Sequence, residues 1–464
     1  MFRTICDLIL PDPDYPPRTR ELDILQRALN GTLYDVLPYE FHDERAPGGD
    51  YIPLRNRRPS VRYALPRIVV EDSVALLFSE GHFPALDCDD SEVRLALAAI
   101  ANATKLNCIM TEAALRGSVG SVAILLRVLG RRMFLEVLDT LYLTPVWDRH
   151  APDTLLRVTE RRKVAGRVLA AEGYDGLNAD TQYWFTRIWD ATWESWFVPQ
   201  PVGGSATPEL DFDRSARHDL GFVPLVWIRN LPGGTGDDGT CTFRAALETS
   251  IEIDYQLSQA GRGLKYSSDP TLLIKEPAGL EGQMVRGAAN ALVVSEKGDA
   301  KLLEIGGTAS QAVIDYVRTL RELALESIHG NRTDASRLSA PASGRALELM
   351  NQGLLWLADN LRTSYGEGGL IPLARLMLRA GAKYGLCMNG IDLSRCADPP
   401  QLRLRWPDWY PSDASDRARD AQTLIALVNA KQLSRETALR VIAMEYGLTD
   451  VSGELARIEN EAMA

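Results

Sequence analysis

Two stretches near the middle of the chain, TFRAALETSIEIDYQLSQAGRGL (242–264) and SQAVIDYVRTLRELALESIH (310–329), have the apolar spacing of amphipathic helices. The first would extend about 35 Å as a helix. Its apolar residues near one face are Phe243, Leu247, Ile251 and Leu257. The stripe of the second contains Val313, Val317, Leu320, Ala324 and Ile328, and Gly330 stands where a helix would end. The sequence therefore predicts two long helices, each with an apolar stripe to bury.

The segment between these helices, 268–309, is β-like and short. Its turn signals are Asp269-Pro270, Pro277, Gly279, Gly282 and Lys297-Gly298-Asp299. We therefore expect a small β unit that is inserted between the two helices.

The first half of the chain is predicted to contain helices followed by a sheet. Residues 1–65 are rich in proline and end in the basic cluster Arg55, Arg57, Arg58 and Arg62. Helices are expected over Arg67–Phe78, from Ser91 as an N-cap, and over Ala103–Arg116. Strands are expected at Val122–Val128, Met133–Val137, Leu155–Thr159, Gln182–Ile188 and Val223–Ile228.

After the second long helix, the polar segment Asn331–Ser343 is too long for a routine helix connection of about 2–8 residues. The elements expected after it are helices at Gly344–Arg362 and Ile371–Tyr384, a strand at Gln401–Trp406, and helices at Ala418–Ala430, Ser434–Tyr446 and Val451–Ala462. The sequence thus predicts an α+β fold that ends in a small helical unit.

Composition excludes several classes of protein. With 464 residues, of which 45% are hydrophobic and 24% charged, the chain is globular and long enough for two to four structural units. Its net charge of −11 argues against tight binding of nucleic acid through counterion release. We find no apolar run long enough for a membrane span and no secretory leader, so we expect a cytoplasmic chain. The six cysteines lack a C-x-x-C pair and are expected to be reduced.

A glycine motif, Gly234-Thr-Gly236-Asp-Asp-Gly239, has the spacing of a dinucleotide-binding turn. Asp237 and Asp238 would face the pyrophosphate, and no acidic residue closes a second parallel strand about 20 residues later. We interpret the motif as a flexible turn and keep a dinucleotide-dependent enzyme as the alternative.

Other motifs of catalytic chemistry are absent from the sequence. There is no Gly-Lys pair for a P-loop, no H-E-x-x-H and no G-x-S-x-G, and the five histidines are scattered. Asp87, Asp89 and Asp90 are explained by an acidic helix start rather than a cation site. Trp184, Trp189, Trp193 and Trp196 are expected to pack the sheet. We therefore predict no catalytic set, no metal and no cofactor.

The order of these elements resembles the portal, or head–tail connector, proteins of tailed bacteriophages. The similar stretches are RYALPRIVVEDSVALLF (62–78), 117–126 with 145–148, HDLGFVPLVWIRN (218–230), SGRALEL (343–349) and 432–461. Together they span roughly residues 50–462, and their order makes the resemblance specific where each fragment alone is weak.

The resemblance implies a portal fold with named parts. These are a wing in two segments (1–240 and 344–410), stem helices at 241–267 and 310–329, a clip at 268–309, a tunnel loop at 330–343 and a crown at 411–464. It also implies a ring, commonly of twelve subunits, at one capsid vertex, through which double-stranded DNA enters and leaves. The chain would then lie in the virion, after assembly in the host cytoplasm, and would not be an enzyme.

The resemblance assigns roles to residues by segment. Expected to face DNA in the tunnel loop are Asn331, Arg332, Arg337 and Ser339. Expected to contact the terminase large subunit or the head–tail adaptor through the clip are Glu276, Glu281, Arg286, Glu296 and Lys297. Expected to pack the stem are Val313, Val317, Leu320 and Ala324.

Some alternatives stay open. Arg332 and Arg337 either touch DNA lightly or pair with Asp334 or wing carboxylates. Major capsid and scaffolding proteins are further expected partners. A different capsid-associated protein, such as an adaptor or minor head protein, is a third interpretation, although it should lack a helix–clip–helix insertion.

Overall fold

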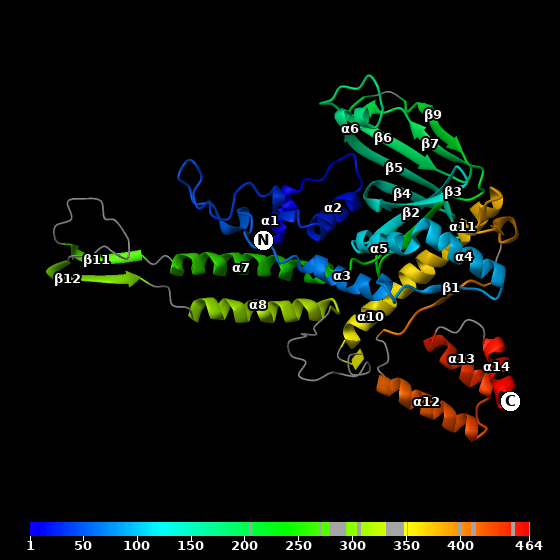
Figure 1. Ribbon diagram of the computed structural model, residues 1–464. Helices are drawn as coiled ribbons and strands as arrows, with labels where there is room; N and C mark the ends of the chain where they lie inside the picture. Colours follow the sequence, from blue (N-terminus) through cyan, green and yellow to red (C-terminus); the bar gives the residue numbers. More distant parts are fainter. Residues whose placement is uncertain are drawn as a thin grey trace. The chain divides into compact units, whose positions relative to one another are not determined.

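The computed structural model describes residues 1–204, 207–268, 271–277, 294–303, 308–330, 348–349, 351–397, 401–409, 414–446 and 451–463. The chain forms two compact units. The larger contains Met1–Arg332 with Trp356–Pro407, and the smaller contains Thr333–Leu355 with Asp408–Ala464. Helices and antiparallel sheets both contribute (Figure 1), which confirms the predicted α+β class.

Short helices and an extended segment form the N-terminal region. They are α1 (Phe2–Leu8), α2 (Pro17–Leu29), η1 (Leu33–Val36), η2 (Leu54–Asn56) and α3 (Leu65–Phe78). The helix predicted from Arg67 begins two residues earlier, because Pro66 occupies its first turn, where the missing N–H costs nothing.

Two further helices, α4 (Ser91–Thr104) and α5 (Leu106–Gly117), follow and meet at Lys105. Asp90, not Ser91, caps α4, since its carboxylate accepts from the backbone N–H of Glu92 at 2.8 Å. Lys105 adopts a left-handed conformation with φ 52°, which ends one helix and starts the next. The helix predicted from Ala103 therefore begins only at Leu106.

Two antiparallel sheets form the centre of the larger unit. The first has the order β10-β2-β3, with β2 at Ser121–Leu129, β3 at Arg132–Asp139 and β10 at Leu225–Arg229. The second contains β4 (Leu143–Trp147), β5 (Leu155–Ala165), β6 (Gln182–Trp189), β7 (Trp193–Phe197), β8 (Gln200–Pro201) and β9 (Leu210–Arg217). All five predicted strands of this region are present, and β4, β7, β8 and β9 were not predicted.

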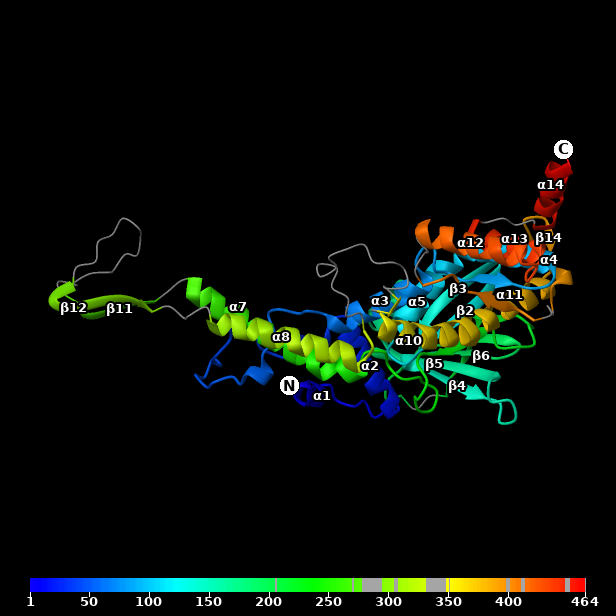
Figure 2. The same cartoon turned by 90° about the horizontal axis from the view of Figure 1, so that it is seen from below.

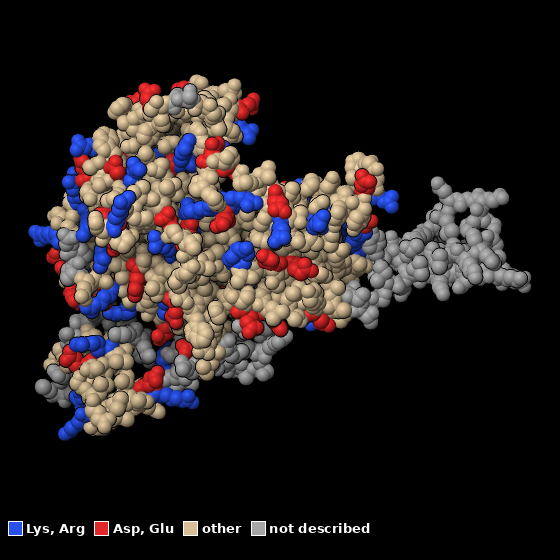
Figure 3. Space-filling view, turned by 180° about the vertical axis from the view of Figure 1, so that it is seen from behind, with Lys and Arg blue, Asp and Glu red and all other residues tan. Residues whose placement is uncertain are grey.

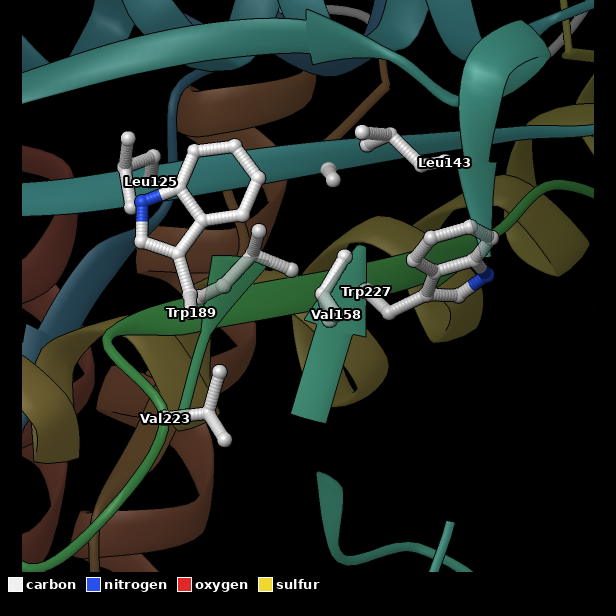
Figure 4. Close-up of a cluster of buried hydrophobic side chains, with 8 residues drawn as sticks. Leu125, Leu143, Val158, Trp189, Val223 and Trp227 are labelled. Carbon is white, nitrogen blue, oxygen red and sulfur yellow. The ribbon is translucent and has the colours of Figure 1, made fainter. Parts of the chain in front are cut away.

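The hydrophobic cluster between these sheets contains Trp189, Trp227 and Val158 (Figure 4). Trp189 is fully buried, and Trp227 donates its indole N–H to the carbonyl of Asp237 at 2.8 Å. Ion pairs lie within and between the same sheets. Arg187 on β6 lies 2.8 Å from Glu160 on β5 within the second sheet, and Arg127 on β2 lies 2.7 Å from Glu194 on β7, which links the two sheets. Trp189 thus packs between the sheets, and Trp196 packs on a second cluster with Phe185, as predicted for both, whereas Trp227 was not among the predicted tryptophans.

A pair of long helices follows the sheets in the chain. They are α7 (Leu247–Ser268) and α8 (Thr308–Ser327), and they lie side by side (Figures 1 and 2). Ala246, just before α7, shares a buried cluster with Ile328, just after α8, so the two helices are antiparallel. Between them in the chain lies an antiparallel ribbon of β11 (Thr271–Pro277) and β12 (Val294–Leu303). The predicted helix, β insertion and second helix are all present.

A continuous rod of helix follows, made of α10 (Gln352–Leu361), a nine-residue π-helix labelled η6 (Arg362–Leu370) and α11 (Ile371–Lys383). The glycines of the π-helix allow close packing. A Cβ at Gly366 would lie 2.8 Å from Leu404 and Trp406, and one at Gly369 would lie 2.7 Å from Ile228 of β10. We predicted two separate helices here, but the wider π-helical turns join them.

The remaining elements are short strands and the C-terminal helices. The strands pair as β1 (Ala85–Asp87) with β15 (Arg403–Arg405) and β13 (Cys387–Met388) with β14 (Ile391–Asp392). The helices are α12 (Ala414–Asn429), α13 (Arg435–Tyr446) and α14 (Val451–Met463), close to the three predicted.

Candidate functional site

The helix pair α7–α8 is the candidate functional element, and Asp254 on α7 makes a buried polar contact with the N-terminal region. This side chain is only 4% exposed. One carboxylate oxygen accepts from the hydroxyl of Tyr34 at 2.7 Å, and the other accepts from the backbone N–H of Tyr63 at 2.7 Å. Burial raises the pKa of Asp254 above its usual value, although the two donors oppose that rise.

Residues 51–67, which we call the strap, lie along α7 through further hydrogen bonds. The hydroxyl of Ser258 accepts from the backbone N–H of Val61 at 2.9 Å, and the hydroxyl of Tyr255 donates to the carbonyl of Arg57 at 2.7 Å. Arg57 is 2% exposed, and its Nε donates to the carbonyl of Ile52 at 2.9 Å. The strap is thus held to α7 by paired polar groups, which would cost energy if they were buried without partners.

The other side of α7 packs on α8. Ile253 and Leu257 of α7 share a hydrophobic cluster with Val317, Leu320 and Ala324 of α8, and Leu65 and Val69 of α3 close it. Ala324 is fully buried, whereas Val317 and Leu320 are partly buried. The guanidinium of Arg321 also donates to the hydroxyl of Tyr63 at 2.9 Å. The predicted stem stripe therefore packs against helices of its own chain.

A groove of about 900 Å³ lies at the start of α7 and the end of α8, where these helices join the rest of the larger unit, which we call the body. Its walls include Cys241, Arg244 and Glu248 before and within α7, His329 after α8, and Trp356 on α10. The rings of His329 and Trp356 meet edge-on with centroids 6.3 Å apart. Burial raises the pKa of the Cys241 thiol to about 12, so this thiol stays protonated and is a poor nucleophile at neutral pH.

The glycine motif forms a closed turn between β10 and α7. Leu231 and Thr240 bridge its base, and a Cβ at Gly239 would lie 2.6 Å from the carbonyl oxygen of Leu231. Asp238 is paired with Arg18 at 2.8 Å and is also hydrogen bonded to Ser121.

The surroundings of this turn differ from those of a dinucleotide site. The carboxylate of Asp237 accepts from the indole of Trp147 at 2.7 Å, so both aspartates are used to hold the turn. The preceding strand β10 is antiparallel to β2, whereas a dinucleotide-binding turn follows a strand of a parallel sheet. The glycines are therefore explained by close backbone packing.

Several residues with predicted roles lie outside the described part of the chain: Glu281, Arg286, Asn331, Arg332, Arg337 and Ser339. Of the other clip residues, Glu276 belongs to β11, and Glu296 and Lys297 belong to β12. The ribbon register shifts between Lys275, opposite Asp299, and Pro277, opposite Val294. These three residues therefore lie near the same irregular end of the ribbon.

Stem residue Val313 is half-buried on α8, one turn before Val317. We did not predict the strap or Asp254. Two features of the sequence could have indicated them. Asp254 stands between the apolar Ile253 and Tyr255 of an amphipathic helix, and the arginine cluster of the strap has no acidic residue within it.

The described residues contain no group of three or more His, Cys, Asp or Glu side chains placed to hold a metal ion. Among the same residues, no single helix is long and apolar enough to cross a membrane, and α4 with α5, which pass only as a pair, are bent by 66°. All six cysteines are free thiols. On the face shown in Figure 3, basic and acidic side chains are interspersed.

Comparisons with known proteins add little. No protein-family model matches the chain, and no curated protein matches it. Among solved structures it is similar to a chain described as "Virion of native gene transfer agent (GTA) particle", with 14% sequence identity and a TM-score of 0.36. That alignment covers 81% of this chain and 87% of the other. A score this low does not establish a common fold, so the function is argued from the chain's own elements.

Proposed function

We propose that this chain is the subunit of a portal ring, the head–tail connector through which a tailed phage or a phage-like particle packages and ejects double-stranded DNA. The observation that carries the proposal is the antiparallel pair α7–α8 with the ribbon β11–β12 inserted between its helices. A helix of 22 residues is about 33 Å long, so a ring of such helices would line about 33 Å of the length of a channel.

The negative net charge of the chain suits a channel through which DNA must slide. DNA that must slide through a channel is stalled by tight phosphate contacts, since each added cation that neutralises a phosphate strengthens binding. A net charge of −11 keeps such contacts weak. In this proposal Arg332 and Arg337 in the segment 331–343 touch the duplex lightly.

The remaining parts follow the same arrangement. The ribbon and its flanking residues dock the terminase large subunit and later the head–tail adaptor. The C-terminal helices α12, α13 and α14 form the crown, and the body with its two sheets forms the wing. Major capsid and scaffolding proteins contact the wing. The ATPase activity for packaging belongs to the separate motor.

The test is the mass and shape of the purified protein. Twelve copies of a 51.3 kDa chain give an annular particle of about 600 kDa, visible by negative-stain microscopy and measurable by light scattering. A monomer at all concentrations would contradict the proposal. The alternative enzyme is tested in parallel, because a bound dinucleotide would raise the melting temperature, whereas a structural turn gives no shift.

A further inference from the structure

The outward face of α8 carries two parallel lines of residues. Tyr316 and Leu323 are seven positions apart, which places them on one line, and they are 48% and 55% exposed. Glu322 and Glu326 form an acidic line beside them, and both are exposed. All four lie away from the stripe of Val317 and Leu320 that packs on α7.

This face has no cover in the described part of the chain. Among the described residues, neither Glu322 nor Glu326 has an ion-pair partner. Asp315 and Arg318 form an ion pair at 3.4 Å, and both of their side chains are exposed. Two large apolar side chains on one line can form the centre of an interaction surface, and the carboxylates beside them can form its polar rim.

The strap exposes apolar side chains and positive charges, which complement the apolar and acidic lines of α8. Tyr51 is 69% exposed and Val61 is 40% exposed. Residues 51–67 contain five arginines and no acidic residue. Arg57 is buried, but Arg55 is exposed, and Arg62 keeps a side chain 38% exposed beside Asp35.

Within one chain the strap meets α8 only on the buried side, where Arg321 of α8 donates to Tyr63 and Leu65 shares the cluster of Val317. Among the described residues, the exposed side chains of Tyr51, Arg55, Val61 and Arg62 form no hydrogen bond or ion pair with the outward face of α8. Figure 1 shows the N-terminal segment and α8 on either side of α7. A second copy of the chain, placed alongside, can supply the missing face.

We propose that the outward face of α8, with Tyr316, Leu323, Glu322 and Glu326, docks on the strap of a second copy, with Tyr51, Val61, Arg55 and Arg62. The contact joins two different faces, so repeating it leads to a closed ring or an open helix rather than a symmetric dimer. Apolar side chains supply the buried area, and the opposite charges fix the register and exclude like faces. This inference rests on the proposed ring and names the surfaces that close it.

The experiment uses charge reversal on each face of the full-length chain. Glu322→Lys with Glu326→Lys on α8, and Arg55→Glu with Arg62→Glu on the strap, each bring like charges together at the proposed contact. Each double variant is expected to lose assembled particles by at least about tenfold at low salt, measured by light scattering. The loss should shrink at 1 M salt, where the screening length is about 3 Å.

Mixing the two variants gives the decisive result. In an alternating ring, the lysines of one variant meet the glutamates of the other, and the second contact joins the two unchanged faces. An equimolar mixture should therefore recover assembly that neither variant shows alone. If the mixture stays disassembled while both variants melt cooperatively, the pairing of these faces is wrong. Should the strap variant fail to melt cooperatively, Arg55→Glu alone replaces it in the same mixture.

A matched control separates this inference from the proposed function. Glu209→Lys with Asp213→Lys makes the same charge change on exposed positions around β9 and should leave assembly unchanged. Wild-type rings together with intact rings of both face variants would overturn only the docking inference. A wild-type chain that never assembles would overturn the proposed ring itself.

Discussion

At the scale of single residues, Asp254 holds α7 to two N-terminal segments that lie far from it in the chain. Its carboxyl is buried, and its two hydrogen bonds come from Tyr34 and Tyr63, which precede it by 220 and 191 residues. Because burial disfavours the charged form, the folded-state pKa lies above the unfolded value. The stability from this group is therefore complete below the unfolded pKa of about 3.9 and is lost as pH rises through the raised folded pKa.

We predict that Asp254→Asn removes this pH dependence. An amide keeps an acceptor for the Tyr63 N–H and carries no charge to desolvate. The difference in unfolding free energy between wild type and variant should move in favour of the variant as pH rises above about 4, because only the wild type must ionise a buried group. Urea unfolding at several pH values measures the difference. A constant difference from pH 3 to 8 would contradict the assigned burial.

Such residue-level contacts could not be predicted from the sequence. The spacing of apolar residues marked α7 as amphipathic, but it did not identify Tyr34 as the partner of Asp254. The same holds for Asp238, whose partner Arg18 lies 220 residues earlier in the chain. A local pattern shows which face of a helix is apolar, and only the folded chain shows what covers the polar positions.

At the scale of elements, the helices from α3 to α5 and the long helices after the sheets were predicted well, because the 3.6-residue period is a local signal. Helices α1 and α2 were missed in the proline-rich N-terminal segment. The start of α7 was predicted five residues too early. Residues 242–246 have the apolar spacing of a helix, but they form a turn in which the side chain of Asn230 donates to the hydroxyl of Thr242 at 2.9 Å. Strands β7 and β9 were missed because their side chains are only half-buried or exposed and lack strict alternation. The π-helix has no period that the sequence could reveal.

We predict that Leu320→Asp separates α8 from α7. Leu320 is partly buried against the cluster of Ile253 and Ala324, so a carboxylate there loses apolar contact and is poorly hydrated. The expected cost is about 3 kcal/mol of unfolding free energy, with loss of assembly as a consequence. Urea unfolding followed by circular dichroism measures the cost.

The control for this change is Gln259→Asp, at an exposed position of α7. It introduces the same charge on the same helix pair and should change the unfolding free energy by less than about 0.5 kcal/mol. Equal effects of the two variants would contradict the packing of α8 on α7.

At the scale of the whole molecule, the segment 331–343 is expected to act on DNA and not on assembly. We predict that its deletion leaves rings intact, because the cluster that joins α7 and α8 ends at Ile328. Packaging or retention of DNA should fall, measured as nuclease-protected DNA in particles.

Replacement of 149–153 by Asn-Gly is the control for that experiment. Asp148 donates its backbone N–H to the carbonyl of Thr154 at 2.9 Å, so a two-residue turn can join these positions. This shorter loop should leave both rings and retained DNA unchanged. Normal DNA retention after removal of 331–343 would show that the DNA-facing role belongs elsewhere.

The π-helix between Leu361 and Ile371 has a consequence for how related chains can diverge. In an α-helix each residue turns the chain by about 100°, so adding or removing one residue within Arg362–Leu370 would turn α10 by about that angle relative to α11. Leu357, Ala358 and Leu361 would then leave their buried positions. Single-codon insertions and deletions in this segment are therefore expected to survive in related chains only together with changes on the buried face of α10.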